Sequence, residues 1–572
     1  MHILFVLLLA VAQAQLEVLS PGSPPQPPPT VTGTSSIEGT VVNDATGEPV
    51  KKAQVRLLGA VSEKQPVAMT DASGSFAFHK LPAGTYVVNA MHDGFDQNRA
   101  LLLGDAQKQV TLTDDQAKNG VELRLPPTGA ISGRITDENG DPAPNCSVGA
   151  LDASTLDSFP WQQQGGRQAQ TDDRGEYRIS NLPAGRYIVY QHCQRGIAAP
   201  HGFMERGDPQ TPVWAWVPGV YGGADEGAGA SALRVHSGEE IRGIDFHLKI
   251  TNAFHVSVTV VPDDPNVNLQ NMWVRLEARD PAMARVLQYG MGRQNNSAEF
   301  HATPVVPGSY IAIADIQLPN KHWHGEEPVE VRDVPPQPVK LSLTSAMTVS
   351  GDLETEDIAT TGTNTNTSGG DDPPSRPQAT VSLIPLKTSF NGGIPQTQPT
   401  DDKGNFSITG VLPGRYQLQV IGATNSIKSV TLAGRGVSPS AIDLGPGATG
   451  PLHVVISMKQ VPVQVSVNNL RQDQQTWVFL LPKGATSPYP GLNPTMASAD
   501  QSPVSMQAPP GEYTAYAMEC TQPWPLLNNP SVLRAIAAMG KAIEVKEDMN
   551  ATATLSVIAR EDLKRALDQD VP

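Results

Sequence analysis

One short motif is repeated along this chain, and it constrains the fold more than any other feature of the sequence. The clearest copies are TDASGSFAFHKLPAGTY at 70–86, TDDRGEYRISNLPAGRY at 171–187 and TDDKGNFSITGVLPGRY at 400–416. Each begins with Asp-x-x-Gly, in which the Asp side chain can accept backbone hydrogen bonds and the Gly adopts positive φ without strain. The motif therefore predicts a tight turn that ends at Gly74, Gly175 or Gly404.

The residues after each turn alternate between apolar and polar side chains. Phe76 and Phe78, for example, lie two residues apart, which is typical of a strand with one buried face. Leu-Pro-Ala-Gly or Val-Leu-Pro-Gly then ends the strand, because Pro removes a backbone donor and Gly lets the chain reverse. A second strand opens at Tyr86, Tyr187 or Tyr416. At such a corner a Tyr can bury its ring and return its hydroxyl to a nearby carbonyl.

Two eroded copies extend the pattern. EFHATPVVPGSY at 299–310 and VSMQAPPGEY at 504–513 keep Pro-Gly-x-Tyr and lose the Asp turn. The five tyrosines then recur at intervals of about one small domain, and 572 residues are too many for a single β-sandwich. We therefore predict an all-β fold, a tandem array of about five immunoglobulin-like or prealbumin-like β-sandwich domains with very little helix. The only helical patterns lie at 532–539 and 561–567.

Composition shifts divide the chain into predicted parts. The second sandwich carries a long aromatic insertion, the third and fifth are degenerate, and the fourth contains a loop at 352–378 that we expect to be disordered because it is polar, aperiodic and rich in Gly and Pro. The predicted boundaries are a signal peptide at 1–14, a Pro-rich linker at 15–36, sandwiches at 37–126, 127–250, 251–345, 346–458 and 459–560, and a C-terminal tail at 561–572.

The first residues have the pattern of a secretory signal. ILFVLLLAVA at 3–12 is apolar but too short to span a membrane, and Ala-Gln-Ala at 12–14 is typical of a cleavage site. No second segment is long and apolar enough to span a bilayer. We predict a secreted, periplasmic or cell-surface protein. The formal net charge of −16, without a basic run, is unfavourable for nucleic-acid binding, so no nucleic-acid partner is expected.

The three cysteines differ in phase. When the repeats are aligned on their turns and tyrosines, Cys146 and Cys193 are in phase with buried positions of the second sandwich. An oxidising compartment permits a disulfide between them, although alignment gives phase and not distance, and two buried thiols are the alternative. Cys520 lies seven residues after Tyr513 and is out of phase with it. We expect Cys520 to face away from its sandwich core as a reactive thiol.

Several positions resemble one known family. Gly39-Thr40-Val41, Gly47-x-Pro49, Val55 and the motif at 70–86 resemble the carboxypeptidase regulatory-like domain. The resemblance is good in repeats one, two and four, and weak in three and five. It implies a transthyretin-like, seven-stranded β-sandwich. Domains of this family accompany zinc carboxypeptidases, outer-membrane receptors and surface proteins without being catalytic. They are also similar to starch-binding-like sandwiches, which gives a hint toward glycan.

A short motif at 324–327 resembles a metal site. His324 and Glu327 have the H-x-x-E spacing of zinc ligands in the associated carboxypeptidases, and His322 lies two residues earlier. Those enzymes need an α/β domain and a distant third ligand, and no alternating helix–strand run of that size exists here. We therefore interpret the segment as a polar hairpin tip, and we predict no catalytic residue, no metal and no cofactor.

The insertion in the second sandwich holds the candidate ligand-stacking residues. Trp214 and Trp216 lie two apart, so on a strand they share a face, and Tyr221 is close by. Exposed aromatic faces of this kind can stack on sugar rings. The alternative, which we favour, is that they anchor the insertion to its own sandwich, since burial of a Trp is strongly stabilising.

These observations favour a non-catalytic binding or scaffold protein outside the cytoplasm, with a cell-envelope glycan or another surface protein as its partner. Two alternatives stay open. One is a structural or adhesive rod without a small ligand, which would be elongated. The other is an accessory subunit or remnant of a zinc carboxypeptidase or an outer-membrane transport system.

Overall fold

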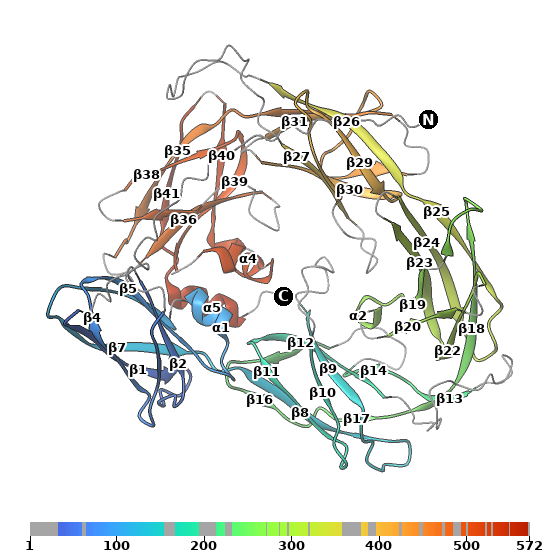
Figure 1. Cartoon of the computed structure of the whole chain (residues 1–572), viewed down its shortest axis with the longest axis horizontal. Helices are drawn as coiled ribbons and strands as arrows, with labels where there is room; N and C mark the ends of the chain where they lie inside the picture. Colours follow the sequence, from blue (N-terminus) through green and yellow to red (C-terminus); the bar gives the residue numbers. More distant parts are fainter. Residues whose placement is uncertain are drawn as a thin grey trace, which may run out of the picture.

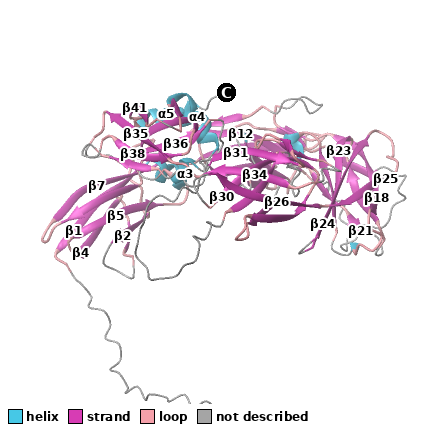
Figure 2. Cartoon of the chain, turned by 90° about the horizontal axis from the view of Figure 1, so that it is seen from above, coloured by secondary structure: helices cyan, strands magenta, loops and turns pink. Residues whose placement is uncertain are grey.

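The structure is a computed structural model in which strands dominate and helices are few and short (Figure 2). The strands form five two-layered units in chain order, which confirms the predicted all-β tandem array. The predicted signal segment 1–14 and residues 15–32 lie outside the described residues. The structure describes residues 33–569 apart from 60–64, 104, 154–165, 194–212, 223–230, 270–271, 285–286, 294–296, 319–320, 357–378, 387–395, 423–425, 446–449, 472–474, 484–493, 499–501, 521–522, 528–529 and 548.

The first three sandwiches account for β1 to β25. The first contains β1 (Ser35–Asn43), β2 (Gln54–Gly59), β3 (Val67–Met69), β4 (Ser75–Leu81), β5 (Gly84–Met91), β6 (Gln107–Leu112) and β7 (Ala117–Leu125). The second contains β8 (Gly129–Thr136), β9 (Ser147–Asp152), β10 (Arg167–Gln170), β11 (Glu176–Leu182), β12 (Gly185–His192), β14 (Gly219–Val220), β15 (Leu233–Val235), β16 (Glu240–Ile241) and β17 (Phe246–His247). The third contains β13 (Val213–Trp216), β18 (Ile250–Pro262), β19 (Trp273–Ala278), β20 (Gln288–Gly290), β21 (Gly292–Arg293), β22 (Glu299–Val305), β23 (Gly308–Leu318), β24 (Lys321–Val331) and β25 (Val339–Ser345).

The last two sandwiches and the helices complete the described chain. The fourth sandwich contains β26 (Met347–Glu356), β27 (Thr380–Pro385), β28 (Gln396–Pro399), β29 (Asn405–Val411), β30 (Gly414–Ile421), β31 (Ser426–Leu432), β32 (Arg435–Gly436), β33 (Ile442–Leu444) and β34 (Leu452–Ser457). The fifth contains β35 (Val461–Asn468), β36 (Thr476–Pro482), β37 (Thr495–Ala497), β38 (Val504–Ala508), β39 (Gly511–Glu519), β40 (Lys541–Val545) and β41 (Ala551–Ser556). The helices are α1 (Gln97–Leu103), α2 (Pro281–Ala284), α3 (Trp524–Leu527), α4 (Pro530–Ile536), the 3-10 helix η5 (Ala537–Met539) and α5 (Arg560–Gln569).

All five sandwiches share one strand order. In one sheet the first strand lies between the motif strand, which is antiparallel to it, and the last strand, which is parallel, as in β4-β1-β7 and β38-β35-β41. In the other sheet the tyrosine strand pairs with the second strand, as β5 with β2 and β39 with β36. The third sandwich has additional pairs of β24 with β25, which joins its two layers into one sheet, and of β13 with β18, and the fourth has an additional pair of β31 with the last strand, β34. The eroded repeats therefore keep the architecture of the clear ones.

The Asp-x-x-Gly turn has the same geometry in its three clear copies. In the first, Asp71 Oδ1 accepts the backbone N–H groups of Ser73 at 2.8 Å and Ser75 at 2.9 Å. Gly74 has φ +73°, and a Cβ on it would lie 2.6 Å from the carbonyl oxygen of Val41. Both the backbone conformation and the space exclude a side chain at this position.

The tyrosine of every repeat returns its hydroxyl to the carbonyl four residues earlier. The oxygen–oxygen distances lie between 2.7 and 2.9 Å in all five copies. The bonds run from Tyr86 to Pro82, Tyr187 to Pro183, Tyr310 to Val306, Tyr416 to Leu412 and Tyr513 to Pro509. Each ring is at least 94% buried, since the exposed fractions run from 1% to 6%. One side chain thus fixes the corner between two strands and fills the core.

Truncation of one corner tyrosine separates these two contributions. Tyr187→Phe keeps the ring and removes one hydrogen bond, so it should destabilise the second sandwich by about 1 kcal/mol. Tyr187→Ala also empties the core position and should cost about 3–5 kcal/mol. Urea unfolding of the two variants measures both values. Equal losses for Phe and Ala would show that the ring contributes nothing to the core.

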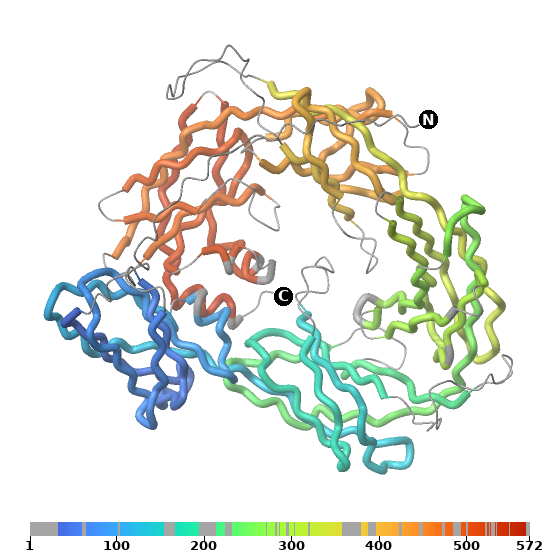
Figure 3. Tube along the Cα trace, viewed as in Figure 1, coloured from blue at the N-terminus to red at the C-terminus, as the bar shows by residue number. Residues whose placement is uncertain are grey.

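The five sandwiches are arranged in a closed ring, with the fifth lying against the first (Figures 1 and 3). In the second to fifth sandwiches the sheet with the tyrosine strand lies on the inner side of the ring, and the other sheet lies outside (Figure 1). The sequence predicts a string of sandwiches and does not predict this closure. The ring also differs from the elongated form expected for a rod.

Two joints connect the first three sandwiches. Between the first and second, Thr128 donates its backbone N–H to Gly94 O at 3.0 Å, and Ser237 donates its hydroxyl to Pro127 O at 2.8 Å. Between the second and third, β13 from the aromatic insertion pairs antiparallel with β18. The second and third sandwiches are therefore joined by sheet hydrogen bonds.

Two further joints connect the third sandwich to the fifth. At the third–fourth joint, Ala346 donates its backbone N–H to His322 O at 2.6 Å. At the fourth–fifth joint, Glu547 forms ion pairs with Lys428 and with Lys459, the latter at 3.9 Å. Every neighbouring pair in the chain is thus held by polar contacts.

The seam between the fifth and first sandwiches closes the ring. Its centre is apolar: Leu103 of α1 is 1% exposed and belongs to a cluster that is otherwise formed by the fifth sandwich and its helices. Around it, Arg560 Nη1 of α5 lies 2.9 Å from Asp105 Oδ1, and Lys564 pairs with Asp44. The cluster consists of Leu103, Phe479, Leu481, Tyr516, Met518, Cys520, Leu527, Val532, Leu533, Ile536, Ile558 and Leu563.

The structure corrects three predictions. Residues 561–569 are not a tail, since they belong to α5, which packs into the seam. The fourth-sandwich loop does not begin at 352, because β26 extends to Glu356, and residues 357–378 lie outside the described part of the chain. Cys520 faces away from its sandwich core, but it is only 1% exposed because the helices and Leu103 cover it. Burial raises the pKa of its thiol to about 12.

The buried thiol provides a native reporter of ring closure. Because the thiolate is the reactive form, Cys520 of the native protein should react with a thiol reagent far more slowly than a free cysteine. The double variant Arg560→Glu, Lys564→Glu places like charges against Asp105 and Asp44 and should open the seam. Its Cys520 should react at least about tenfold faster, whereas Arg565→Glu on the solvent side of α5 should match the native chain. Fast labelling of the native protein would contradict the closed seam.

Candidate functional site

A cluster of charged side chains lies on the inner sheet of the third sandwich. Strands β19, β23 and β24 lie side by side there, and their register places Arg275, Ile313 and Glu326 in one row and Trp273, Asp315 and His324 in the next. The alternate residues of these strands, such as Leu276 and Ala314, point into the core. Since the core lies between the two layers, the charged face is the one turned toward the inside of the ring (Figure 1).

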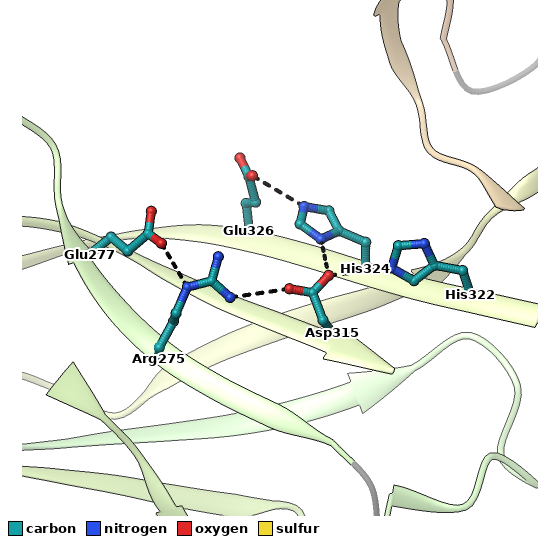
Figure 4. A network of polar contacts seen from close by, with 6 residues as sticks. All are labelled: Arg275, Glu277, Asp315, His322, His324 and Glu326. Carbon is teal, nitrogen blue, oxygen red and sulfur yellow. Dashed lines mark hydrogen bonds and ion pairs between the residues drawn. The ribbon is translucent and has the colours of Figure 1, made fainter. Parts of the chain in front are cut away.

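Asp315 lies at the centre of this network (Figure 4). Its Oδ1 lies 2.7 Å from His324 Nδ1 and 3.4 Å from His322 Nε2, and its Oδ2 lies 3.2 Å from Arg275 Nη1. Arg275 Nε also contacts Glu277 Oε1 at 2.6 Å. The carboxylate therefore bridges all three strands.

Both ring nitrogens of His324 face carboxylate oxygens. Nδ1 meets Asp315, and Nε2 lies 3.1 Å from Glu326 Oε1. A carboxylate can only accept, so both nitrogens must carry protons and the ring must be an imidazolium. Burial acts to lower the pKa of His324, but the hydrogen bonds to Asp315 and Glu326 outweigh it and raise the pKa to about 9.

The acid at the centre shows the complementary shift. Burial acts to raise the pKa of Asp315, but hydrogen bonds from His322 and His324 and the charges of His324 and Arg275 hold it well below its usual range. The side chains of Arg275 and Asp315 are 11% and 10% exposed. With Arg275 and His324 positive and Asp315, Glu277 and Glu326 negative, the five groups carry one net negative charge at neutral pH.

Ile313 shows how the network is arranged above the sheet. Its side chain is 1% exposed although it lies outside the apolar core clusters. In the register it is flanked by Arg275 on one side and Glu326 on the other. The charged side chains thus cover an apolar base, and this lowers their contact with water and strengthens their mutual attraction.

The structure corrects the interpretation of 322–327 as a hairpin tip. His324 lies inside β24 and is paired with Asp315, three residues from Lys321, which pairs with Leu318 at the end of the ladder. Strand residues three apart point to opposite faces, so His324 and Glu327 cannot bind the same ion, and the H-x-x-E spacing has no ligand geometry here. Within the described residues, no group of three or more His, Cys, Asp or Glu side chains is arranged to hold a metal.

The candidate stacking residues of the insertion have different environments. Trp216 donates its Nε1–H to Glu138 Oε2 at 2.8 Å and packs against the second core. Tyr221 packs against the same core, with its ring 6.0 Å from that of Phe246. Trp214 is 62% exposed and lies on β13, opposite Asn252 of the third sandwich. The structure therefore does not join the three residues into one platform.

The second sandwich contains a disulfide between Cys146 and Cys193, with a Cα–Cα distance of 4.4 Å. Both residues are buried in its core, beside Val148 and Val189. A cross-link of this kind reduces the conformational entropy of the unfolded chain and so favours the folded sandwich. It occurs in proteins that fold in oxidising compartments.

Trp273 is the most prominent residue that sequence reasoning overlooks. Its side chain is 78% exposed, the largest value among the exposed large hydrophobic residues that the structure describes. The charged partners Arg275, Glu277 and Asp315 are likewise absent from the sequence-based candidates. Their signal is weak, since it consists of polar residues at alternate positions of otherwise apolar strands, and only the three-dimensional register brings them together.

The network lies outside the part of the chain that a family model matches. A family model of the carboxypeptidase regulatory-like domain matches residues 36–126 and 130–191. The first two sandwiches are carboxypeptidase regulatory-like domains. Both carboxypeptidase regulatory-like matches end before β19, so the network and Trp273 lie outside them. No curated protein sequence matches the chain. Among the described residues no helix is long and apolar enough to cross a membrane.

Solved structures with some likeness include bacterial pilins. The Bacillus anthracis TIE protein is 16% identical over 55% of this chain, with a TM-score of 0.17, and this chain spans only 51% of its length. The minor pilin GBS52 of Streptococcus agalactiae is 13% identical over 38% of this chain and 97% of its own, with a TM-score of 0.21. The shaft pilin SpaA of Lactobacillus rhamnosus GG is 8% identical over 38% of this chain and 97% of its own, with a TM-score of 0.20. With sequence identities and TM-scores this low, these likenesses carry no argument about the function of this chain.

The raised pKa of His324 has a defined effect on stability. A group whose pKa is higher in the folded state stabilises fully below its unfolded pKa, near 6.5, and loses this contribution as the pH rises through about 9. Asp315, whose pKa is lowered, contributes above about pH 4 and loses its contribution on acidification. The network should therefore be most stabilising between about pH 4 and 6.5.

A histidine titration tests this arrangement. In an NMR titration of the native protein, one imidazole should titrate near pH 9, and His324→Gln should remove that transition. The destabilisation caused by His324→Gln should be roughly 3 kcal/mol at pH 6 and much smaller at pH 10. Glu326→Gln should lower the same pKa without removing the transition. The arrangement would be wrong if every histidine titrated below pH 7.

Proposed function

We propose that the protein is a non-catalytic scaffold that works outside the cytoplasm, at the cell envelope or in its surroundings, and presents binding surfaces at fixed angles. The observation that carries this proposal is ring closure through the α5 seam, where Arg560 and Lys564 meet acids of the first sandwich. An open string of sandwiches would leave neighbouring surfaces free to reorient. A closed ring holds all of them in one arrangement, which suits a protein that binds an extended partner at several points.

Three further observations support this proposal. The Cys146–Cys193 disulfide fits an oxidising compartment, and residues 1–14 have the pattern of a secretory signal. The family model of the carboxypeptidase regulatory-like domain matches both of the first two sandwiches, and this resemblance implies domains that accompany enzymes and receptors without being catalytic.

The partner in this proposal is a cell-envelope glycan or another surface protein. A rod without a ligand is less compatible with the seam, since ring closure shortens the molecule. An accessory role beside a zinc carboxypeptidase or a transport system would use the same scaffold surfaces with a protein partner. Trp214 is exposed at the joint between the second and third sandwiches, and it is a proposed contact for a protein partner.

Secretion and shape can be tested on the same preparation. Expressed with residues 1–14, the protein should be exported and should begin at Gln15, with Cys146 and Cys193 linked in non-reduced peptide mapping. Small-angle scattering should give a compact ring, and removal of residues 560–572 should increase the maximum dimension because the seam is lost. A cytoplasmic protein with reduced thiols, or a rod-like scattering profile of the full chain, would overturn the proposed function.

A further inference from the structure

We propose that the inner face of the third sandwich is a carbohydrate-binding site in which Trp273 stacks on a sugar ring and the neighbouring polar row, with Asp315 and Thr344, recognises its hydroxyl groups. This inference rests on the proposed scaffold function and gives it a ligand class: an uncharged polysaccharide or oligosaccharide. The site lies outside the carboxypeptidase regulatory-like domains and is distinct from the aromatic insertion at Trp214.

Trp273 supplies the apolar platform. A strand side chain that is 78% exposed leaves the indole face open to a ligand. Exposure of a large aromatic ring to water is unfavourable, and such residues are characteristic of binding surfaces. The faces of sugar rings are lined with C–H groups, which pack well against an aromatic face, while their edges carry the hydroxyl groups. An aromatic residue beside fixed polar groups matches both parts of such a ligand.

The register supplies the polar groups next to the platform. Trp273 on β19 lies opposite Asp315 on β23, which lies opposite His324 on β24, and His324 lies opposite Thr344 on β25. Neighbouring positions in such a row are about 5 Å apart. The row thus presents an aromatic ring, a carboxylate acceptor and, beyond the imidazolium that holds this carboxylate, the hydroxyl group of Thr344. The exposed Gln317 follows Asp315 on the same face of β23 and can both donate and accept.

The polar groups are held in place before a ligand arrives. Asp315 is fixed by Arg275 and by the two histidines, and His324 is fixed between Asp315 and Glu326. Preorganised groups lose little conformational entropy on binding, and this favours affinity for a neutral ligand. Glu326 keeps 42% of its side chain exposed, so it can accept a hydroxyl hydrogen bond at the edge of the network.

Charge determines the class of glycan. The network carries one net negative charge, and the whole chain has a formal net charge of −16. Both repel polyanionic chains such as sulfated or uronic-acid polymers. An uncharged glycan meets no such repulsion, and its hydroxyl groups can donate to Asp315 and Glu326 while they accept from Thr344 and Gln317.

The experiment compares defined sugars on matched variants of the full-length protein. Isothermal titration calorimetry with cellohexaose, maltohexaose and chitohexaose should find at least one ligand, and heparin should not bind. Trp273→Ala should weaken the binding of that ligand by at least about tenfold, whereas Trp273→Phe, which keeps an aromatic face, should lose less. Trp214→Ala serves as the matched control, because it removes another exposed Trp, and it should bind like the native chain.

Three results would overturn the proposal: none of the three hexaoses binds, heparin binds in their place, or Trp214→Ala loses affinity while Trp273→Ala does not. Slow labelling of Cys520 in each variant verifies that the ring is intact, so that a loss of binding is not a loss of fold. Failure of sugar binding with a closed, exported and disulfide-linked ring would remove this site and leave the scaffold function standing. Failure of export or ring closure would remove the scaffold function itself.

Discussion

Burial of the seam between α5 and the first sandwich is the constraint on which the shape of this molecule depends. The four other joints connect sandwiches that follow one another in the chain, whereas the seam joins Leu103 to a cluster that begins at Phe479 and joins Asp105 to Arg560. Its apolar centre favours association, and the ion pairs of Arg560 and Lys564 fix how the two surfaces meet. Without the seam, the same sandwiches would form an open arc.

The sequence was sufficient for the architecture of a single sandwich and insufficient for their assembly. The Asp turn, the alternation after it and the corner tyrosine are local, so Gly74 and Tyr86 can be interpreted from their neighbours in the chain. The seam is formed by residues that are ordinary in their own segments. Cys520 shows the difference: its phase correctly places it outside its sandwich core, but the covering helices and Leu103 come from elsewhere. Long-range contacts of this kind leave no periodic signal.

The candidate site was hidden for the same reason. His324 stood out through its spacing to Glu327, yet its partners in the structure are Asp315 on the neighbouring strand and Glu326 two residues away. Trp273 has no distinctive neighbours in the sequence, and its importance comes from the strand register and from its exposure. The spacing of Trp214 and Trp216 is the more conspicuous aromatic pattern in the sequence. In the structure, however, Trp216 packs against the core of the second sandwich and donates a hydrogen bond to Glu138.

The seam also governs how one chain meets another. Because four joints already hold the first and fifth sandwiches near each other, each sees the other at an effective concentration in the millimolar range or above. Contacts that would be weak between separate molecules are then saturated within one chain. A second chain offering its own fifth sandwich would have to displace this internal partner, so the ring disfavours the head-to-tail filaments that an open heterologous interface would build. Closure of the ring thereby disfavours head-to-tail association of this repetitive, multi-domain chain.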